Sequence, residues 1–202
     1  MSMPMFPLGT VLFPHALLPL HVFEERYRLM TRRVLRGDGE FGVVLIERGS
    51  EVGGGDARFD VGTVARVVRA QELPDGGYAL ATVGMRRMRV TRWLSDDPYP
   101  QAEVVDLADD SAAGDATRRA RTLGAFAEVC ELHRRIDPRL PDLPAIDEAP
   151  GQASYEIAAL APIGPLDAQR VLEVPGTGDR LDLLADLLDD HARMLRSGGR
   201  LD

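Results

Sequence analysis

Apolar positions fill the first part of the chain, and no charged residue occurs before Glu24. Four prolines interrupt this region, and because each removes a backbone donor and fixes φ, only short or edge strands fit there. These prolines are Pro4, Pro7, Pro14 and Pro19. Apolar residues then recur at helical spacing, at Phe23, Tyr27, Met30 and Val34. The pattern predicts a helix from about Phe23 to a glycine-assisted end at 37–39, with Phe23 and Tyr27 as core aromatics.

The next part of the chain is rich in β-branched residues and predicts a succession of strands. Strands are expected over residues 40–47, 61–73, 78–83, 86–94 and 101–107. Residues 74–77 read Pro-Asp-Gly-Gly, a turn sequence, and Gly84 is expected to separate two strands. Gly53–Gly55 are interpreted as a flexible hairpin connection, since the run neither matches a phosphate-binding motif nor precedes a helix.

From Ser111 the β-branched residues give way to Ala, Leu, Arg and Glu, and the remainder is expected to be helical. Helices are predicted over residues 115–136, 152–160 and 166–174, and a last one is introduced by Gly178. A proline-rich connector at 138–150 separates the first helix from the others. The predicted organisation is therefore a β-rich lobe at 1–110 and a helical lobe at 111–202, an α+β fold.

Composition narrows the classes of function. The 202 residues are 45% hydrophobic, enough for a sizeable core, and carry a net charge of −8 with a pI near 5.1. An acidic balance makes nucleic acid an unlikely partner. One cysteine excludes an intrachain disulfide, and the N-terminus does not read as a signal peptide. No run reaches the ~18 apolar residues of a membrane span, so we expect a cytoplasmic protein with no membrane contact.

All 24 basic residues are arginine, and the sequence contains neither lysine nor asparagine. The absence of lysine excludes a Walker A phosphate loop, a Ser-Lys dyad and a Schiff-base amine. The absence of asparagine excludes a Cys-His-Asn arrangement. The composition therefore excludes enzymes whose mechanism depends on one of these four arrangements.

The candidate chemical groups each have a structural interpretation. No two of the four histidines lie four residues apart, so a metal site is not expected; His15 and His21 are interpreted as buried and bonded to backbone, and His133 as a surface residue. Cys130 is expected in a helix core rather than as a thiolate. No serine lies in a G-x-S-x-G motif, and Ser154 is interpreted as a helix cap.

Charged residues also leave two questions open. The neighbouring carboxylates Asp109–Asp110 and Asp189–Asp190 are expected in water, although a general-acid pair elsewhere is not excluded by the sequence. Arginines cluster in the strand at 86–94, at Arg86, Arg87, Arg89 and Arg92. Arg87 and Arg89 share one face with Thr91 and are expected on the solvated side of the sheet, with binding of a carboxylate or phosphate as the alternative.

Four segments in order resemble the LON substrate-binding domain, as found at the amino terminus of ATP-dependent Lon proteases and in the LON-like region of cereblon. They are FPLGTVLFPHALLPLHVFEERYR (6–28), FGVVLIERGSEVGGGD (41–56), VGTVARV (61–67) and YALATVGMRRMRV (78–90). A weaker match continues at SYEIAALAPI (154–163), so the resemblance covers roughly residues 4–195.

The resemblance implies a PUA-like lobe, a twisted mixed sheet closing partly into a barrel, followed by an all-helical lobe. It implies a non-enzymatic module that binds polypeptides, with unfolded or protease-directed proteins as partners, through apolar surface between the lobes. It assigns no catalytic residue, cofactor, metal ligand or substrate-binding residue, and no oligomeric state. RNA binding is the alternative, because PUA-like folds occur in RNA-associated proteins and the arginines cluster.

Overall fold

The computed structural model describes residues 2–48, 57–110 and 115–198, and it divides the chain into two compact units, residues 1–108 and 109–202. The expected connection at Gly53–Gly55 and the composition change at Ser111 lie outside the described residues. Each unit is described by itself below.

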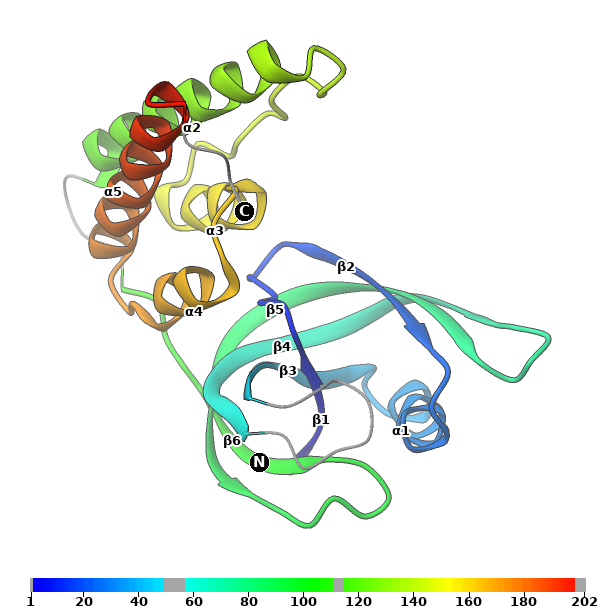
Figure 1. Cartoon of the computed structure of the whole chain (residues 1–202). Helices are drawn as coiled ribbons and strands as arrows, with labels where there is room; N and C mark the ends of the chain where they lie inside the picture. The colour runs from blue at the N-terminus through cyan, green and yellow to red at the C-terminus, as the bar shows by residue number, and fades with distance from the viewer. Residues whose placement is uncertain (1, 49–56, 111–114, 199–202) are drawn as a thin grey trace. The chain divides into compact units, whose positions relative to one another are not determined.

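In its described residues, the first unit is a β-barrel with one helix (Figure 1). Its elements are β1 (Ser2–Leu8), β2 (Leu17–Val22), α1 (Glu25–Arg36), β3 (Glu40–Arg48), β4 (Ala57–Glu72), β5 (Tyr78–Trp93) and β6 (Gln101–Asp106). The strand order is β2-β5-β4-β3-β1-β6, and β5 also pairs with β6, which closes five strands into a ring. The β1–β3 pair is parallel and the other pairs are antiparallel. The mixed sheet of an α+β fold is thus confirmed.

Strand residues pack on both faces of this sheet, because alternate side chains point to opposite sides. One buried cluster takes residues from all five ring strands and fills the barrel; it comprises Met3, Met5, Val44, Val64, Met88, Val90, Ala102 and Val104. A second cluster lies on the outer face, where Tyr27, Met30 and Val34 of α1 pack against Phe41 and Val43 of β3.

Gly84 does not break a strand, contrary to the sequence-based expectation. It lies within the continuous β5, where the register with β4 shifts between Val64 and Ala65. A Cβ at Gly84 would lie 2.1 Å from the carbonyl oxygen of Phe13. The glycine is needed because the segment before β2 crosses this close to the strand.

Within residues 115–198 the second unit contains four helices, α2 (Asp115–Ile136), α3 (Pro150–Leu160), α4 (Pro165–Glu173) and α5 (Thr177–Arg196). Apolar side chains of α2 and α5 meet at Phe126, Val129 and Leu188, with Ile157 of α3 in the same cluster. The predicted helices are present. The apolar spacing of the last helix predicts a core stripe of Leu181, Leu184, Leu188 and Leu195; the first three are buried in α5, whereas Leu195 is only half-buried.

Arg180 lies at the centre of the helical unit and is 0% exposed. Its guanidinium stacks on the Tyr155 ring at 4.0 Å and donates to Ser154 Oγ at 2.8 Å and to the Val174 carbonyl at 3.0 Å. Asp109 accepts hydrogen bonds from both Tyr155 Oη and Arg180 Nη1. The expectation that Ser154 caps a helix was therefore wrong, because Ser154 is buried, whereas Asp109 is exposed as expected and in addition accepts these two hydrogen bonds.

The two aromatic residues near the start of α1, Phe23 and Tyr27, differ in burial. Tyr27 is buried and stacks on Phe6 with ring centroids 4.2 Å apart, as expected. Phe23 lies before the helix and is 51% exposed, so its assignment to the core was wrong. Helical spacing does not bury a residue that precedes the first turn.

Candidate functional site

Strand β2 presents apolar side chains to solvent. Side-chain burial alternates along β2. Leu18, Leu20 and Val22 face the apolar cluster on the outer face of the sheet, whereas Leu17 and Pro19 are exposed. Leu17 is 75% exposed, and Phe23 just beyond the strand continues the outward-facing set. We call the side chains of Leu17, Pro19, His21 and Phe23 the β2 patch.

An exposed apolar strand face contributes little to folding, because its side chains stay in water. Contiguous exposed apolar residues are instead typical of interaction surfaces. Among the described strands β2 pairs only with β5, so it forms an edge of the sheet. Pro19 suits that edge because it has no amide hydrogen to place there.

A cavity of about 170 Å³ lies beside the β2 patch. It is bordered by Pro19, His21 and Phe23 of the patch and reaches the stacked rings of Phe6 and Tyr27. The His21 and Phe23 rings lie 6.1 Å apart at a tilt of 50°. The surface thus combines exposed apolar groups with a shallow, aromatic-lined depression.

Charges lie at the start of α1, next to this depression. Arg26 lies over the Tyr27 ring at 4.5 Å and donates to Glu24 Oε2 at 3.1 Å. Glu24 itself borders the cavity. The apolar surface therefore has a polar rim, the usual arrangement at protein interfaces.

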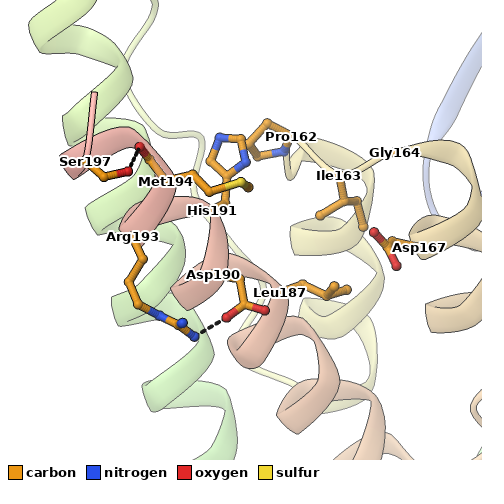
Figure 2. Close-up of a pocket in the computed structure, with 10 residues that line it drawn as sticks. All are labelled: Pro162, Ile163, Gly164, Asp167, Leu187, Asp190, His191, Arg193, Met194 and Ser197. Atoms are coloured by element: carbon orange, nitrogen blue, oxygen red, sulfur yellow. Dashed lines mark hydrogen bonds and ion pairs between the residues drawn. The ribbon is translucent and has the colours of Figure 1, made fainter. Parts of the chain in front are cut away.

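The helical unit holds a larger cavity of about 740 Å³ between the α3–α4 connection and α5. Figure 2 shows Ile163 and Leu187 among its lining residues, together with the carboxylates of Asp167 and Asp190. Asp190 pairs with Arg193, and Asp167 is bonded to Arg170 at 2.8 Å. The cavity mixes apolar walls with neutralised charges, and no nucleophile paired with a base lines it.

The arginine cluster of β5 is largely occupied by partners within the barrel. Arg86 donates to Glu40 at 2.9 Å and to Asp106 at 2.8 Å, and Arg92 pairs with Glu103. Arg87 was expected on the solvated face but is buried and donates to the Ala108 carbonyl. Arg89 is exposed and forms no ion pair with another described residue, so the cluster offers little free positive charge.

Histidine placement differs from expectation. His15 and His21 are exposed, not buried; His15 adopts φ 66° where the chain turns into β2. His133 is half-buried on α2 and faces His191 on α5, with the two Nε2 atoms 3.4 Å apart. Burial and the nearby His133 lower the pKa of His191. Separation by 58 residues hid this pair from any spacing rule.

Cys130 and the paired carboxylates carry no catalytic geometry. Cys130 packs against the α2–α5 core, and burial raises the pKa of its thiol, which keeps it protonated. Asp189 accepts from Arg121 at 3.3 Å. Within residues 2–48, 57–110 and 115–198, no group of three or more metal-binding side chains occurs.

The family model described as the ATP-dependent protease La (LON) substrate-binding domain matches residues 2–190. The chain belongs to the LON substrate-binding domain family. Its relatives include Lon protease of Anaeromyxobacter dehalogenans, 28% identical over 99% of this chain, and Lon protease 2 of Myxococcus xanthus, 29% identical over 99%. The chain covers 24% and 25% of those proteins, so it spans about a quarter of their length.

Solved LON domains have the same fold. A Lon N-terminal domain protein from Xanthomonas campestris is 27% identical with a TM-score of 0.66, covering 92% of this chain and 98% of the other. The N-terminal domain of Mycobacterium avium complex Lon protease, 18% identical, also has a TM-score of 0.66, covering 95% of this chain and all of the other. The first segment of the resemblance, residues 6–28, contains the β2 patch. The family resemblance therefore includes the residues of the β2 patch, but the sequence does not show that their side chains face solvent.

Among the described helices none is long and apolar enough to cross a membrane.

Proposed function

We propose that this LON domain is a non-enzymatic, cytoplasmic module that binds polypeptides, particularly extended or unfolded segments, through the β2 patch. The observation that carries the proposal is the exposure of Leu17 and Phe23 on an edge strand beside an aromatic-lined cavity. Family membership supports it, because the matching family is described as substrate-binding.

The expected lack of catalysis rests on the sequence. Without lysine the chain forms neither an ATP-binding Walker A loop nor a Ser-Lys protease dyad. Its relatives are Lon proteases, of which it matches about a quarter. We therefore expect this module to hold protein substrates and to take no part in cleaving them.

The test measures binding of a fluorescently labelled protein that has been reduced and carboxymethylated so that it cannot refold. We expect the double substitution Leu17→Ser, Phe23→Ser to weaken binding ~10-fold or more, because burial of such side chains dominates interface energies. The matched control is Val68→Ser, Val105→Ser, which removes two exposed apolar side chains of the same unit from β4 and β6. Equal affinities for the two double variants would contradict the proposal.

RNA binding, the alternative, has less support because Arg86, Arg87 and Arg92 are engaged within the barrel. We expect no salt-dependent binding of mixed-sequence RNA by fluorescence anisotropy at low ionic strength. Binding that is lost on Arg89→Ala would favour the RNA alternative instead.

A further inference from the structure

Strand β2 has a free edge among the described strands, and its pairing with β5 determines which backbone groups point there. Residues along an antiparallel pair alternate between those bonded to the partner strand and those whose N–H and C=O groups point away from it. The pairing runs from Leu17 opposite Val83 to Val22 opposite Tyr78 without a shift in register. The orientation of one residue therefore fixes the orientation of the whole strand.

Two contacts establish that orientation. Gly84 of β5 donates its N–H to the Ala16 carbonyl at 2.9 Å, so the backbone of Gly84 faces the β2 side. Two residues earlier, the Thr82 hydroxyl donates to the Leu18 carbonyl at 2.7 Å, which shows that this carbonyl points toward β5. By alternation the backbone of Leu20 also bonds to β5.

The remaining positions of β2 direct their backbone groups out of the sheet edge. The N–H groups of Leu17 and His21 point outward, as do the carbonyls of Leu17, Pro19 and His21, and none of them has a strand partner among the described residues. The side chains at the same positions belong to the β2 patch. Free backbone groups and exposed apolar side chains therefore occur together, and such an edge is a template for another extended chain.

The 170 Å³ cavity lies at this edge. Residues from both faces of β2 border it, Pro19 and His21 from the exposed face and Leu20 from the opposite face. Phe6 and Tyr27 form other parts of its lining. The cavity is smaller than the ~300–1,000 Å³ of small-molecule pockets and suits a single apolar side chain. Every second side chain of a strand added to β2 would point toward the face on which this lining lies.

Pro19 affects which chain can occupy the edge, because it has no N–H to offer at the middle of β2. If two copies of β2 paired in an antiparallel manner about Pro19, both hydrogen bonds at the centre would be lost. A segment of another protein that has an N–H opposite Pro19 donates to the Pro19 carbonyl and loses only one bond. The edge therefore favours a different polypeptide over a second copy of this chain.

We propose that an extended, predominantly apolar segment of the bound polypeptide adds to β2 as an extra strand and places one apolar side chain in the cavity. This inference rests on the proposed function and specifies how the β2 patch holds its partner. Main-chain hydrogen bonds do not depend on side-chain identity, so the site accepts many sequences. It excludes segments with proline at the positions whose N–H groups face β2.

The first test asks which backbone amides of the full-length protein become protected when a peptide binds. The probe is an octapeptide of alternating leucine and threonine, and NMR follows hydrogen exchange residue by residue. At saturation we expect the amides of Leu17 and His21 to exchange at least ~10-fold more slowly. Those of Leu18 and Leu20, already bonded to β5, should change little. Binding of the octapeptide without this selective protection would overturn strand addition while leaving the β2 patch as the binding surface.

Two variants at one position provide a matched test on the protein side. His21→Pro removes an outward-facing N–H together with the imidazole, whereas His21→Ala removes only the imidazole. We expect His21→Pro to bind the reduced, carboxymethylated protein ~3–10-fold more weakly than His21→Ala does, as for the loss of one hydrogen bond. Circular dichroism and Trp93 fluorescence check that both variants fold.

The outcomes separate strand addition from the proposed function. Equal affinities of His21→Pro and His21→Ala would overturn strand addition. The proposed function is decided independently, by whether Leu17→Ser, Phe23→Ser binds the same unfolded protein more weakly than the control Val68→Ser, Val105→Ser.

Discussion

Each unit encloses one arginine, Arg87 in the barrel and Arg180 in the helical unit, but the surroundings of the other buried polar groups differ. In the barrel, buried Glu40 lies near the surface, where half-exposed Arg66 and Arg86 bind it at 2.7 and 2.9 Å. In the helical unit, Arg180 is fully enclosed and most of its partners are neutral: a ring, a hydroxyl and a carbonyl. The barrel has two apolar clusters and exposed apolar side chains on β2, whereas the helical unit combines an apolar α2–α5 cluster with the polar network around Arg180.

The Arg180 network and the β2 patch differ in what they contribute to the stability of the fold. A buried guanidinium is costly to desolvate, so it persists only with its hydrogen bonds satisfied. The Arg180 network holds the segment at Asp109 against α3 and α5. By contrast the β2 patch is not required by packing, which is why we assign it a function.

The largest expected effect is on the helical unit. Arg180→Ala should lower its free energy of unfolding by about 4 kcal/mol, because it leaves a cavity beside the Tyr155 ring and removes the hydrogen bonds that Arg180 makes to Ser154 Oγ, Asp109 and the Val174 carbonyl. Far-UV circular dichroism follows the helices, while fluorescence of Trp93, the single tryptophan, follows the barrel. Arg170→Ala is the control, because Arg170 is exposed on α4 and pairs only with the partly exposed Asp167 among the described residues; it should cost less than about 1 kcal/mol. Similar losses in the two variants would show that the network does not stabilise this unit.

In the barrel, Tyr27→Ala should lower the free energy of unfolding by about 3 kcal/mol, since it removes a buried ring stacked on Phe6. Phe23→Ala should cost less than about 1 kcal/mol because half of its side chain is already in water. Denaturant titration followed by Trp93 fluorescence measures both. If Phe23→Ala were as damaging as Tyr27→Ala, the β2 patch would be core and not binding surface.

Two glycine substitutions should have opposite signs in the two units. Gly84→Ala in β5 should cost about 2 kcal/mol, because the new methyl group would overlap the Phe13 carbonyl. Gly124→Ala in α2 meets nothing within 4 Å and should stabilise by about 0.5–1 kcal/mol through helix propensity. Thermal denaturation checks both signs, and a neutral Gly84→Ala would mean that the segment before β2 moves freely away from the strand.

The smallest effect concerns pH. The pKa of His191 is lower in the folded than in the unfolded protein, so the unfolded state binds the proton more tightly. Stability of the helical unit should be complete above the unfolded-state pKa of about 6.5 and fall as the pH drops below it. The groups involved are His191 and the facing His133. Melting temperatures between pH 8 and pH 5 should decline less in His191→Gln, and an identical decline would contradict this assignment.

Much of the architecture was readable from the sequence because it rests on local rules. The turn at Pro74–Gly77, the helix at 115–136 and the α5 leucines follow from φ preferences and apolar periodicity. Gly84 was misread because its role is a contact with Phe13, 71 residues earlier, that no local rule contains. Arg87 was wrongly expected to be solvated. Alternation along the strand predicted which face of the sheet its side chain is on, but not that the side chain is buried on that face.

The sequence by itself determined the α+β class, the order of elements, the family and the absence of lysine-dependent chemistry, since each depends on residue type and spacing along the chain. Tertiary structure alone decided that Leu17 and Phe23 face solvent, that Arg180 is enclosed with Ser154, and that His133 meets His191. Exposure and pairing depend on which distant segments pack together. Such packing is set by the sum of many weak contacts and is not encoded at any single position.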